Sequence, residues 1–318
     1  MDSHRATPED LDELPLDHLR DLTLAEASGP DLPPHVASAS GVARRGRNVY
    51  VIGDESNHLA AFDLTSDEPG SLIRALSGDV PTDPAERADH KSDLEALTVL
   101  PPGEGSPYGI LLGVGSGSGS KRDRGFAWDL EADGSLHGEP REVDLSPVFE
   151  LLRGEIGDLN VEGAAVLSDE LLLFHRGNDG DTDNAIARIS LPHALESMRG
   201  DLRIDVEELA SLRAYELGKL EGVDLCFSDA TPLGDGYVVF TASAEDSDGA
   251  IHGSVIGLLA PDGDVQRLRR IDRKWKVEGV HATADTGVLD LLFVCDQDDP
   301  DTPSPLLGAS MPMEVGLE

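Results

Sequence analysis

The chain has 318 residues, of which 62 are acidic and 25 are basic, so its formal net charge is −37. Nucleic acids and anionic membranes require a basic face, and we therefore expect neither as a partner. The sequence lacks an apolar run of about eighteen residues, and its first residues lack the basic start and apolar middle of a secretory signal. We expect a soluble, cytoplasmic protein.

A short apolar word, usually with one acid inside it, recurs along the chain and predicts a structural repeat. In chain order the copies are SASGVARRG (38–46), SDLEALTVL (92–100), LNVEGAAVL (159–167), KLEGVDLCF (219–227) and KVEGVHATA (276–284). A second apolar run that ends in polar residues follows each word, and further strand-like runs with Gly, Asp and Pro turns follow most of them. Four short strands per unit are typical of propeller blades.

The spacing of the words predicts the number of blades. Neighbouring copies lie 55 to 67 residues apart, which is enough for a blade with an inserted loop, and the longest interval contains a helix-like insert at 146–158. We expect an all-β propeller of five blades, with six as the alternative. The segment HLRDLTL (18–24) resembles an outer strand, and pairing it with the last blade would close the ring. The predicted organisation is a tail at 1–17 and one propeller domain at 18–318.

The amino-acid sequences of several segments resemble those of a known family. The segments are SASGV, YVIGDESNHLAAFDL, KSDLEALTVL, LLGVGSGSGSKRDRG, NVEGAAV, FHRGN and FSDATPL, in this order. They resemble an uncharacterised family of bacterial β-propeller proteins, filed as a domain of unknown function, from about residue 36 onward. The resemblance implies a propeller and no particular reaction. A looser similarity, to esterase-like phytase and calcium-dependent apyrase propellers, is architectural and does not carry function over.

The acids in the repeated words are candidate metal ligands. The first strand of each propeller blade lines the central channel, so we expect the acids to converge there; they are Glu95, Glu162, Glu221 and Glu278. Converging carboxylates raise one another's pKa and need water, protons, bases or a cation, and no Lys or Arg stands at the equivalent positions. Oxygen ligands without His or Cys favour Ca²⁺ over Zn²⁺, whereas Mg²⁺ demands stricter octahedral geometry. We predict a Ca²⁺ site, with Mg²⁺ the less suited ion.

Three other interpretations of these glutamates stay open, one of which is direct acid–base catalysis. They could accept backbone amides of the next blade and so clasp the blades together, or they could line a water-filled channel. Asp224 and Asp229, close to the fourth word, are either further oxygen ligands or turn residues.

The polar ends of the second strands suggest an anion site. The segment GVGSGSGSKRDRG (113–125) contains Lys121, Arg122 and Arg124, which could form an anion-binding concavity, with a flexible hairpin as the alternative. It lacks the Gly-Lys-Ser/Thr order of a Walker loop. The corresponding segment of the next unit, FHRGND, adds His175 and Arg176, and VIGDES of the first unit adds Asp54 and Glu55.

These candidates support two hypotheses, and the sequence leaves open whether the protein is an enzyme. In the first, it is a metal-assisted hydrolase of a phosphoester or another anionic small molecule, in which Arg176 and Arg122 balance oxyanion charge and His175 moves a proton. In the second, it is a non-catalytic propeller with a structural metal that binds a small anionic ligand or another protein. The sequence has no Gly-x-Ser-x-Gly nucleophile elbow.

The two cysteines carry a separate prediction. Cys226 and Cys295 lie in apolar strand-like runs of different units and lack the spacing of metal ligands. We expect two buried thiols and no disulfide between them.

Overall fold

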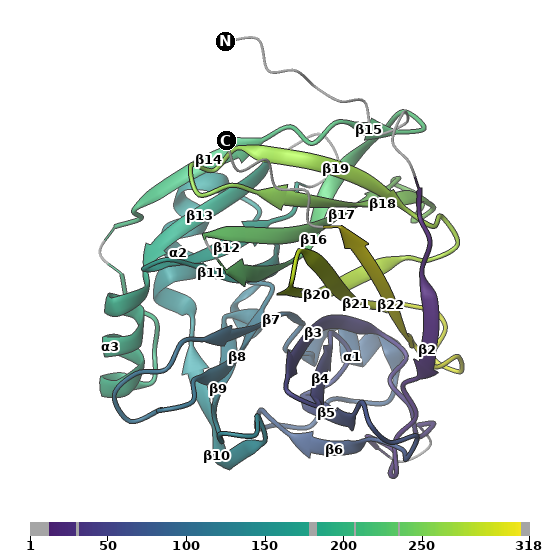
Figure 1. Ribbon diagram of the computed structural model, residues 1–318. Helices are drawn as coiled ribbons and strands as arrows, with labels where there is room; N and C mark the ends of the chain where they lie inside the picture. The colour runs from purple at the N-terminus through teal and green to yellow at the C-terminus, as the bar shows by residue number, and fades with distance from the viewer. Residues whose placement is uncertain (1–12, 30–31, 178–182, 207, 235, 313–318) are drawn as a thin grey trace.

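The computed structural model describes residues 13–29, 32–177, 183–206, 208–234 and 236–312. Its strands form five sheets arranged as in a β-propeller (Figure 1). The innermost strands contact one another in a closed ring, in the order β3 (Ala39–Arg45), β7 (Leu94–Leu100), β11 (Val161–Leu167), β16 (Val223–Gly234), β20 (Val277–Asp285) and back to β3. The chain is therefore all-β with a propeller arrangement, as the sequence predicts.

Three of the sheets are antiparallel blades of four strands each. They consist of β3, β4 (Asn48–Gly53), β5 (His58–Asp63) and β6 (Ser71–Arg74); of β7, β8 (Ile110–Gly115), β9 (Arg124–Leu130) and β10 (Leu136–Asp144); and of β11, β12 (Glu170–His175), β13 (Asn184–Ser190) and β14 (Ser211–Tyr215). Neighbouring blades cover both faces of the second strand, and β8, for example, is buried at every residue. This is why its sequence, ILLGVG, is apolar without alternation.

The sheet around β16 is larger than the regular four-stranded blade that we expected. It contains β15 (Lys219–Leu220), β16, β17 (Tyr237–Glu245), β18 (Ile251–Leu259), β19 (Val265–Ile271) and β1 (Glu13–Leu14). The short strand β15 pairs with the start of β16, and β1 pairs in parallel with β19. The first strand, β1, starts at Glu13, which lies inside the segment 1–17 that we predicted as a tail. Residues 1–12 of that segment lie outside the described residues.

The last sheet joins the two ends of the described chain. It contains β20, β21 (Val288–Cys295), β22 (Pro305–Pro312) and β2 (Asp17–Asp21). Asp17 lies opposite Gly308, and Asp21 lies opposite Pro305. Pairing of the N-terminal strand with the last sheet is therefore confirmed for 18–21. The following residues leave this sheet, and Leu24 forms a bridge to Gly70 beside β6.

Three α-helices and one 3-10 helix lie in the connections of the described chain. They are α1 (Pro84–His90), η2 (Ser120–Arg122), α2 (Ser146–Ile156) and α3 (Leu191–Asp201). The predicted insert at 146–158 is α2, which has proline in its first turn and ends at Gly157, where φ is 93°. Each helix is too short or too polar to form a bilayer-spanning segment within the described ranges.

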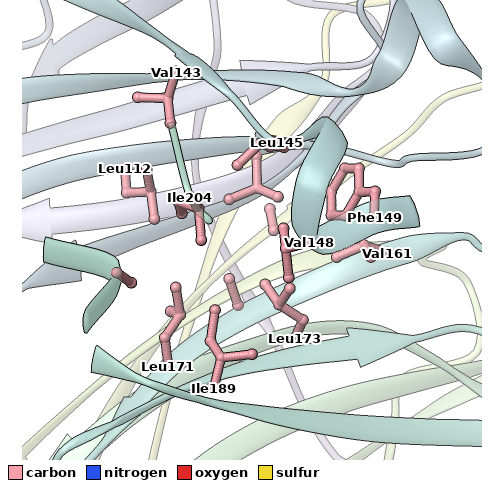
Figure 2. Close-up of a cluster of buried hydrophobic side chains, with 14 of the residues drawn as sticks. Leu112, Val143, Leu145, Val148, Phe149, Val161, Leu171, Leu173, Ile189 and Ile204 are labelled. Carbon is pink, nitrogen blue, oxygen red and sulfur yellow. The ribbon is translucent and has the colours of Figure 1, made fainter. Parts of the chain in front are cut away.

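The hydrophobic core is divided among the interfaces between neighbouring sheets. Figure 2 shows one such cluster, in which Val148 and Phe149 of α2 face Val161, Leu171 and Leu173 of the third sheet. The helix thus fills the wedge between β8 and β12, where a loop of polar residues would leave apolar side chains in contact with water.

The cysteines are joined by no disulfide, as predicted. Cys295 is fully buried on β21, whereas Cys226 is only half-buried on β16. The prediction of two buried thiols is therefore confirmed for Cys295 and wrong for Cys226, which lies on the first part of β16 before the strand enters the ring.

Candidate functional site

A β-bulge marks the same position in every inner strand of the ring. Strand pairing skips one residue there, and the five skipped residues are Ser40, Glu95, Glu162, Ser228 and Glu278. A bulge leaves the extra residue outside the ladder and redirects its side chain. The charge of Glu162 raises the pKa of both Glu95 and Glu278, so these three bulge glutamates lie close enough to influence one another.

Glu221 does not belong to this ring, so the prediction of four converging glutamates is wrong for this residue. It lies in the turn between β15 and β16 with φ of 51°, and its side chain is 44% exposed. Its carboxylate contacts Arg273 Nη2 at 2.5 Å and His252 Nδ1 at 3.4 Å. The fourth copy of the inner-strand word is FSDA, with Ser228 at the bulge, because LEGV at this place forms a hairpin turn instead.

Two of the channel glutamates are buried next to one arginine. Glu162 and Glu278 are 8% and 7% exposed. Arg176, which follows β12, donates from Nη2 to Glu245 Oε2 at 2.5 Å, and its Nη1 lies 3.8 Å from Glu162 Oε1. Asn160 donates its side-chain amide to Glu162 Oε1 at 2.7 Å. Burial raises the pKa of Glu162 to about 6 against the effect of Arg176, and it raises the pKa of Glu278 to about 8.

A second group of carboxylates lies where the first sheet meets the second. Asp54 directly follows β4, Asp93 directly precedes β7, and Glu95 is the bulge residue of β7. Each offers one oxygen, and these three oxygens lie within 4.8 Å of one another. Burial raises the pKa of Asp54 and of Glu95, and neighbouring carboxylates raise the pKa of Glu95 further. We call these three residues the acidic triad.

The channel also contains cations of the chain itself. Lys91 Nζ lies 2.5 Å from Asp54 Oδ2 and 2.8 Å from Asp93 Oδ1. Burial disfavours the charge of Lys91, but Asp54 and Asp93 outweigh this and raise its pKa above the usual range. Lys276 Nζ lies 3.6 Å from Glu278 Oε1 and 3.1 Å from Asp296 Oδ2. The bulge positions hold no Lys or Arg, as the sequence shows, and the compensating cations come from residues two or more positions away from the bulges.

The three residues predicted for catalysis lie in different surroundings. Arg122 Nη1 contacts Asp93 Oδ2 at 2.9 Å, at the edge of the acidic triad, whereas Arg176 Nη1 lies 3.8 Å from Glu162 Oε1. His175 is 2% exposed, and its Nδ1 lies 3.1 Å from both the backbone nitrogen and the backbone oxygen of Asn160. Burial lowers the pKa of His175, so the ring is neutral at pH 7. The structure does not bring these three side chains together.

The expected anion-binding concavity is also dispersed. Lys121 donates to the backbone oxygen of Asp89 at 2.7 Å, and Arg124 binds Glu142 Oε2 at 3.2 Å. Of the three bases in 113–125, Arg122 is the one that contacts a member of the acidic triad. The segment carries η2 between the end of β8 and the start of β9. Lys121 and Arg122 both donate to backbone oxygens of α1, whereas Arg124 binds Glu142, so the three bases do not form one concavity.

One buried aspartate, and none of the bulge glutamates, accepts a backbone amide of the neighbouring sheet in the described hydrogen bonds. The carboxylate of Asp229 accepts backbone N–H groups of Ala230 at 2.7 Å and of Val280, in the next sheet, at 2.8 Å. The other inner strands have Gly or Ala at this position, and a Cβ on Gly163 would lie 2.8 Å from the backbone nitrogen of Ala230. Neighbouring strands approach too closely there for a longer side chain, and Asp229 instead spans the junction between the fourth and fifth sheets.

Asp93 and Lys91 are the site residues that were not predicted. Lys91 directly precedes the second word and Asp93 is its second residue, and the signal that could have identified Asp93 is positional. It lies two residues before Glu95, as Lys276 lies two residues before Glu278. An alignment of the residues flanking the words would have placed a charged side chain at this position in both copies.

A closed ring of sheets with a charged channel defines the protein as a β-propeller. The chain belongs to the family of unknown function DUF6929, which matches residues 35–311. No curated protein is detectably similar in sequence.

The solved structures to which the chain is similar include an arabinofuranosidase and an arabinanase. The α-L-arabinofuranosidase PaAbf62A from Podospora anserina, in complex with cellotriose, is 11% identical, has a TM-score of 0.52, and the match covers 95% of this chain and 98% of that one. The Bacillus subtilis arabinanase Arb43A is 10% identical, has a TM-score of 0.44, and the match covers 92% of this chain and 96% of that one. At such identities the similarity concerns the fold alone.

Proposed function

We propose that the protein is a five-bladed propeller, with the six-stranded sheet as its fourth blade, that binds a divalent cation through Asp54, Asp93 and Glu95. The spacing of the three carboxylate oxygens, all within 4.8 Å of one another, is the observation that carries this proposal. Two oxygens that bind one Ca²⁺ at about 2.3–2.6 Å lie at most about 5 Å apart. The acidic triad therefore fits the ligand sphere of a single ion.

Ca²⁺ is the ion that suits this ligand set best. The acidic triad combines the end of β4 with the start of β7, so its members belong to two sheets. Ca²⁺ accepts six to eight oxygen ligands in flexible geometry, including water, whereas Mg²⁺ requires a near-ideal octahedron. Hard carboxylate ligands without His or Cys do not favour Zn²⁺.

Calorimetric titration of Ca²⁺ into the purified protein tests this proposal. We expect one binding event, and at a hundredfold excess over the dissociation constant a stabilisation of about 3 kcal/mol that a chelator reverses. Asp93→Asn and, separately, Glu95→Gln should abolish both effects. Glu162→Gln is the matched control, because it neutralises a buried channel glutamate outside the acidic triad and should keep Ca²⁺ binding. Equal binding by all variants would refute the assignment of ligands.

Hydrolysis by channel carboxyl groups is the second candidate function. The observation that favours it is the difference between Glu162 and Glu278, whose pKa values are raised to about 6 and about 8 beside the same arginine. At pH 7 one group is mainly ionised and the other mainly protonated, which is the pairing that acid–base catalysis requires. Glycosidic bonds are cleaved by two such carboxyl groups, and the arabinofuranosidase with a similar fold is named for this reaction.

A panel of nitrophenyl glycosides and phosphoesters, assayed with Ca²⁺ and with a chelator, separates the remaining alternatives. We expect glycoside turnover that Glu278→Gln abolishes while Ca²⁺ binding persists. Phosphoester turnover that needs Ca²⁺ and is lost in Asp93→Asn would instead identify a metal-assisted hydrolase, with Arg122 close to the bound anion. Absence of turnover together with Ca²⁺ binding would favour the non-catalytic propeller that binds a small ligand or another protein.

A further inference from the structure

Lys91 places a positive charge inside the acidic triad. Its Nζ lies 2.5 Å from Asp54 Oδ2 and 2.8 Å from Asp93 Oδ1, and the side chain is 14% exposed. Both aspartates belong to the proposed ligand set. An ammonium group at these distances is a cation that the chain itself supplies to the site.

A divalent cation and this ammonium group would compete for the carboxylates of the acidic triad. An ion bound at about 2.4 Å to the same two carboxylates would lie within a few ångströms of Lys91 Nζ. Two cations at such a distance in a partly desolvated channel repel each other strongly. Binding of the ion therefore requires that Lys91 withdraw from the site.

Lys91 is also the residue at which α1 ends. Its backbone N–H donates to Arg87 O at 2.8 Å, and Arg87 Nη1 contacts Glu55 Oε2 at 2.6 Å. From the other side, Lys121 donates to the backbone oxygen of Asp89 at 2.7 Å and Arg122 to that of Ala88 at 3.1 Å. The helix is thus connected to the site by polar contacts, and none of its described side chains is buried.

Among its described residues, this helix buries no apolar side chain. Segments with few buried apolar contacts open with small free energies compared with the rest of a fold. Withdrawal of Lys91 would pull on the last turn of α1 and loosen the contacts of Arg87 and Arg122. We propose that Lys91 is a tethered cation that occupies the metal position, and that a divalent cation displaces it together with α1. This inference rests on the proposed Ca²⁺ site and describes its regulation.

Substitution of Lys91 tests the competition directly. Lys91→Met retains the length of the side chain without its charge, and we expect its affinity for Ca²⁺ to be at least about tenfold higher than that of the wild type, within the usual range of coupling between sites. Lys276→Met is the matched control, because Lys276 is an equally buried channel ammonium that contacts Glu278, Asp296 and Asp298 and not the acidic triad. Its affinity for Ca²⁺ should equal that of the wild type.

A second measurement uses the wild-type protein, so its result does not depend on whether a variant folds. Acetylation followed by mass spectrometry should find Lys91 protected without Ca²⁺ and reactive at saturating Ca²⁺, while exposed Lys219 reacts in both states. Hydrogen exchange should accelerate in 84–90 upon addition of Ca²⁺.

The outcomes distinguish this inference from the proposed function. If the wild type binds Ca²⁺ while Lys91 stays protected and Lys91→Met binds no tighter, the site stands and the displacement is wrong. If Lys91→Met binds Ca²⁺ and the wild type does not, Lys91 blocks the site as inferred and Ca²⁺ binding is not a property of the native chain. If neither binds Ca²⁺, both proposals are overturned.

Discussion

Replacement of Asp229 by alanine is expected to destabilise the protein by about 2–5 kcal/mol. The carboxyl group is 0% exposed, and its oxygens accept the backbone N–H groups of Ala230 and Val280, which oppose the rise of its pKa caused by burial. Its removal leaves two buried donors without a partner, and each such donor costs about 1–3 kcal/mol. The lost hydrogen bond to Val280 joins the fourth and fifth sheets, so we expect the contact between these two sheets to be weakened most. Urea unfolding of both proteins at pH 7 measures the difference.

Asp224→Ala is the matched control for this prediction. Asp224 lies on the same strand, but its side chain is 70% exposed and contacts Lys219 in solvent at 2.7 Å. Exposed ion pairs contribute about 0–1 kcal/mol, so this variant should unfold close to the wild type. An equally small effect of Asp229→Ala would show that the clasp does not hold the sheets together.

Replacement of Glu278 by glutamine is expected to stabilise the protein by about 2–4 kcal/mol at pH 8 and to change little at pH 5. Burial raises the pKa of this carboxyl group from 4.5 to about 8, while Arg176 and Lys276 only partly oppose the shift. The folded state therefore prefers the protonated form, and stability present below pH 4.5 is lost as pH rises toward 8. One unit of pKa corresponds to about 1.4 kcal/mol, and glutamine removes this loss.

Urea unfolding at pH 5 and pH 8 measures the effect, with Glu162→Gln as a graded comparison. The pKa of Glu162 is raised only to about 6, so its substitution should stabilise less at pH 8 than that of Glu278. The cations lose no essential partner in the Glu278 variant, because Lys276 still contacts Asp296 and Arg176 still contacts Glu245. Destabilisation by Glu278→Gln at pH 8 would contradict the assignment of a buried, reluctantly ionised carboxyl group. A gain in stability would be typical of a residue retained for function.

The repeated word predicted the architecture because an inner strand leaves a strong local signal. Four of its five copies form β3, β7, β11 and β20, and the segment ahead of β3 supplies the closing strand β2. The prediction is wrong for the fourth copy, because LEGV at 220–223 has the sequence of an inner-strand segment but adopts the backbone conformation of a turn. Positive φ at Glu221 and Gly222 turns the chain into a hairpin, and the inner strand continues to FSDA. A short sequence similarity alone therefore does not determine which residues form the strand or its register.

The composition of the site was less predictable than the fold, since it depends on bulges and on contacts between sheets. Three of the four predicted glutamates reach the channel, whereas Asp54 joins Asp93 and Glu95 only because β4 and β7 end and begin side by side in space. Lys91 comes from the end of a helix and leaves no periodic signal. The sequence places His175 next to Arg176 and so suggested that both face the same site. Neighbouring residues along a strand point to opposite sides, however, and the side chain of His175 is buried.

Anomalous diffraction from crystals soaked in Mn²⁺, a stand-in for Ca²⁺ with strong anomalous signal, tests the central claim most directly. We expect one peak within bonding distance of oxygens of Asp54, Asp93 and Glu95, with Lys91 withdrawn. The contradicting result is a well-ordered channel without a peak, in which Lys91 still bridges Asp54 and Asp93.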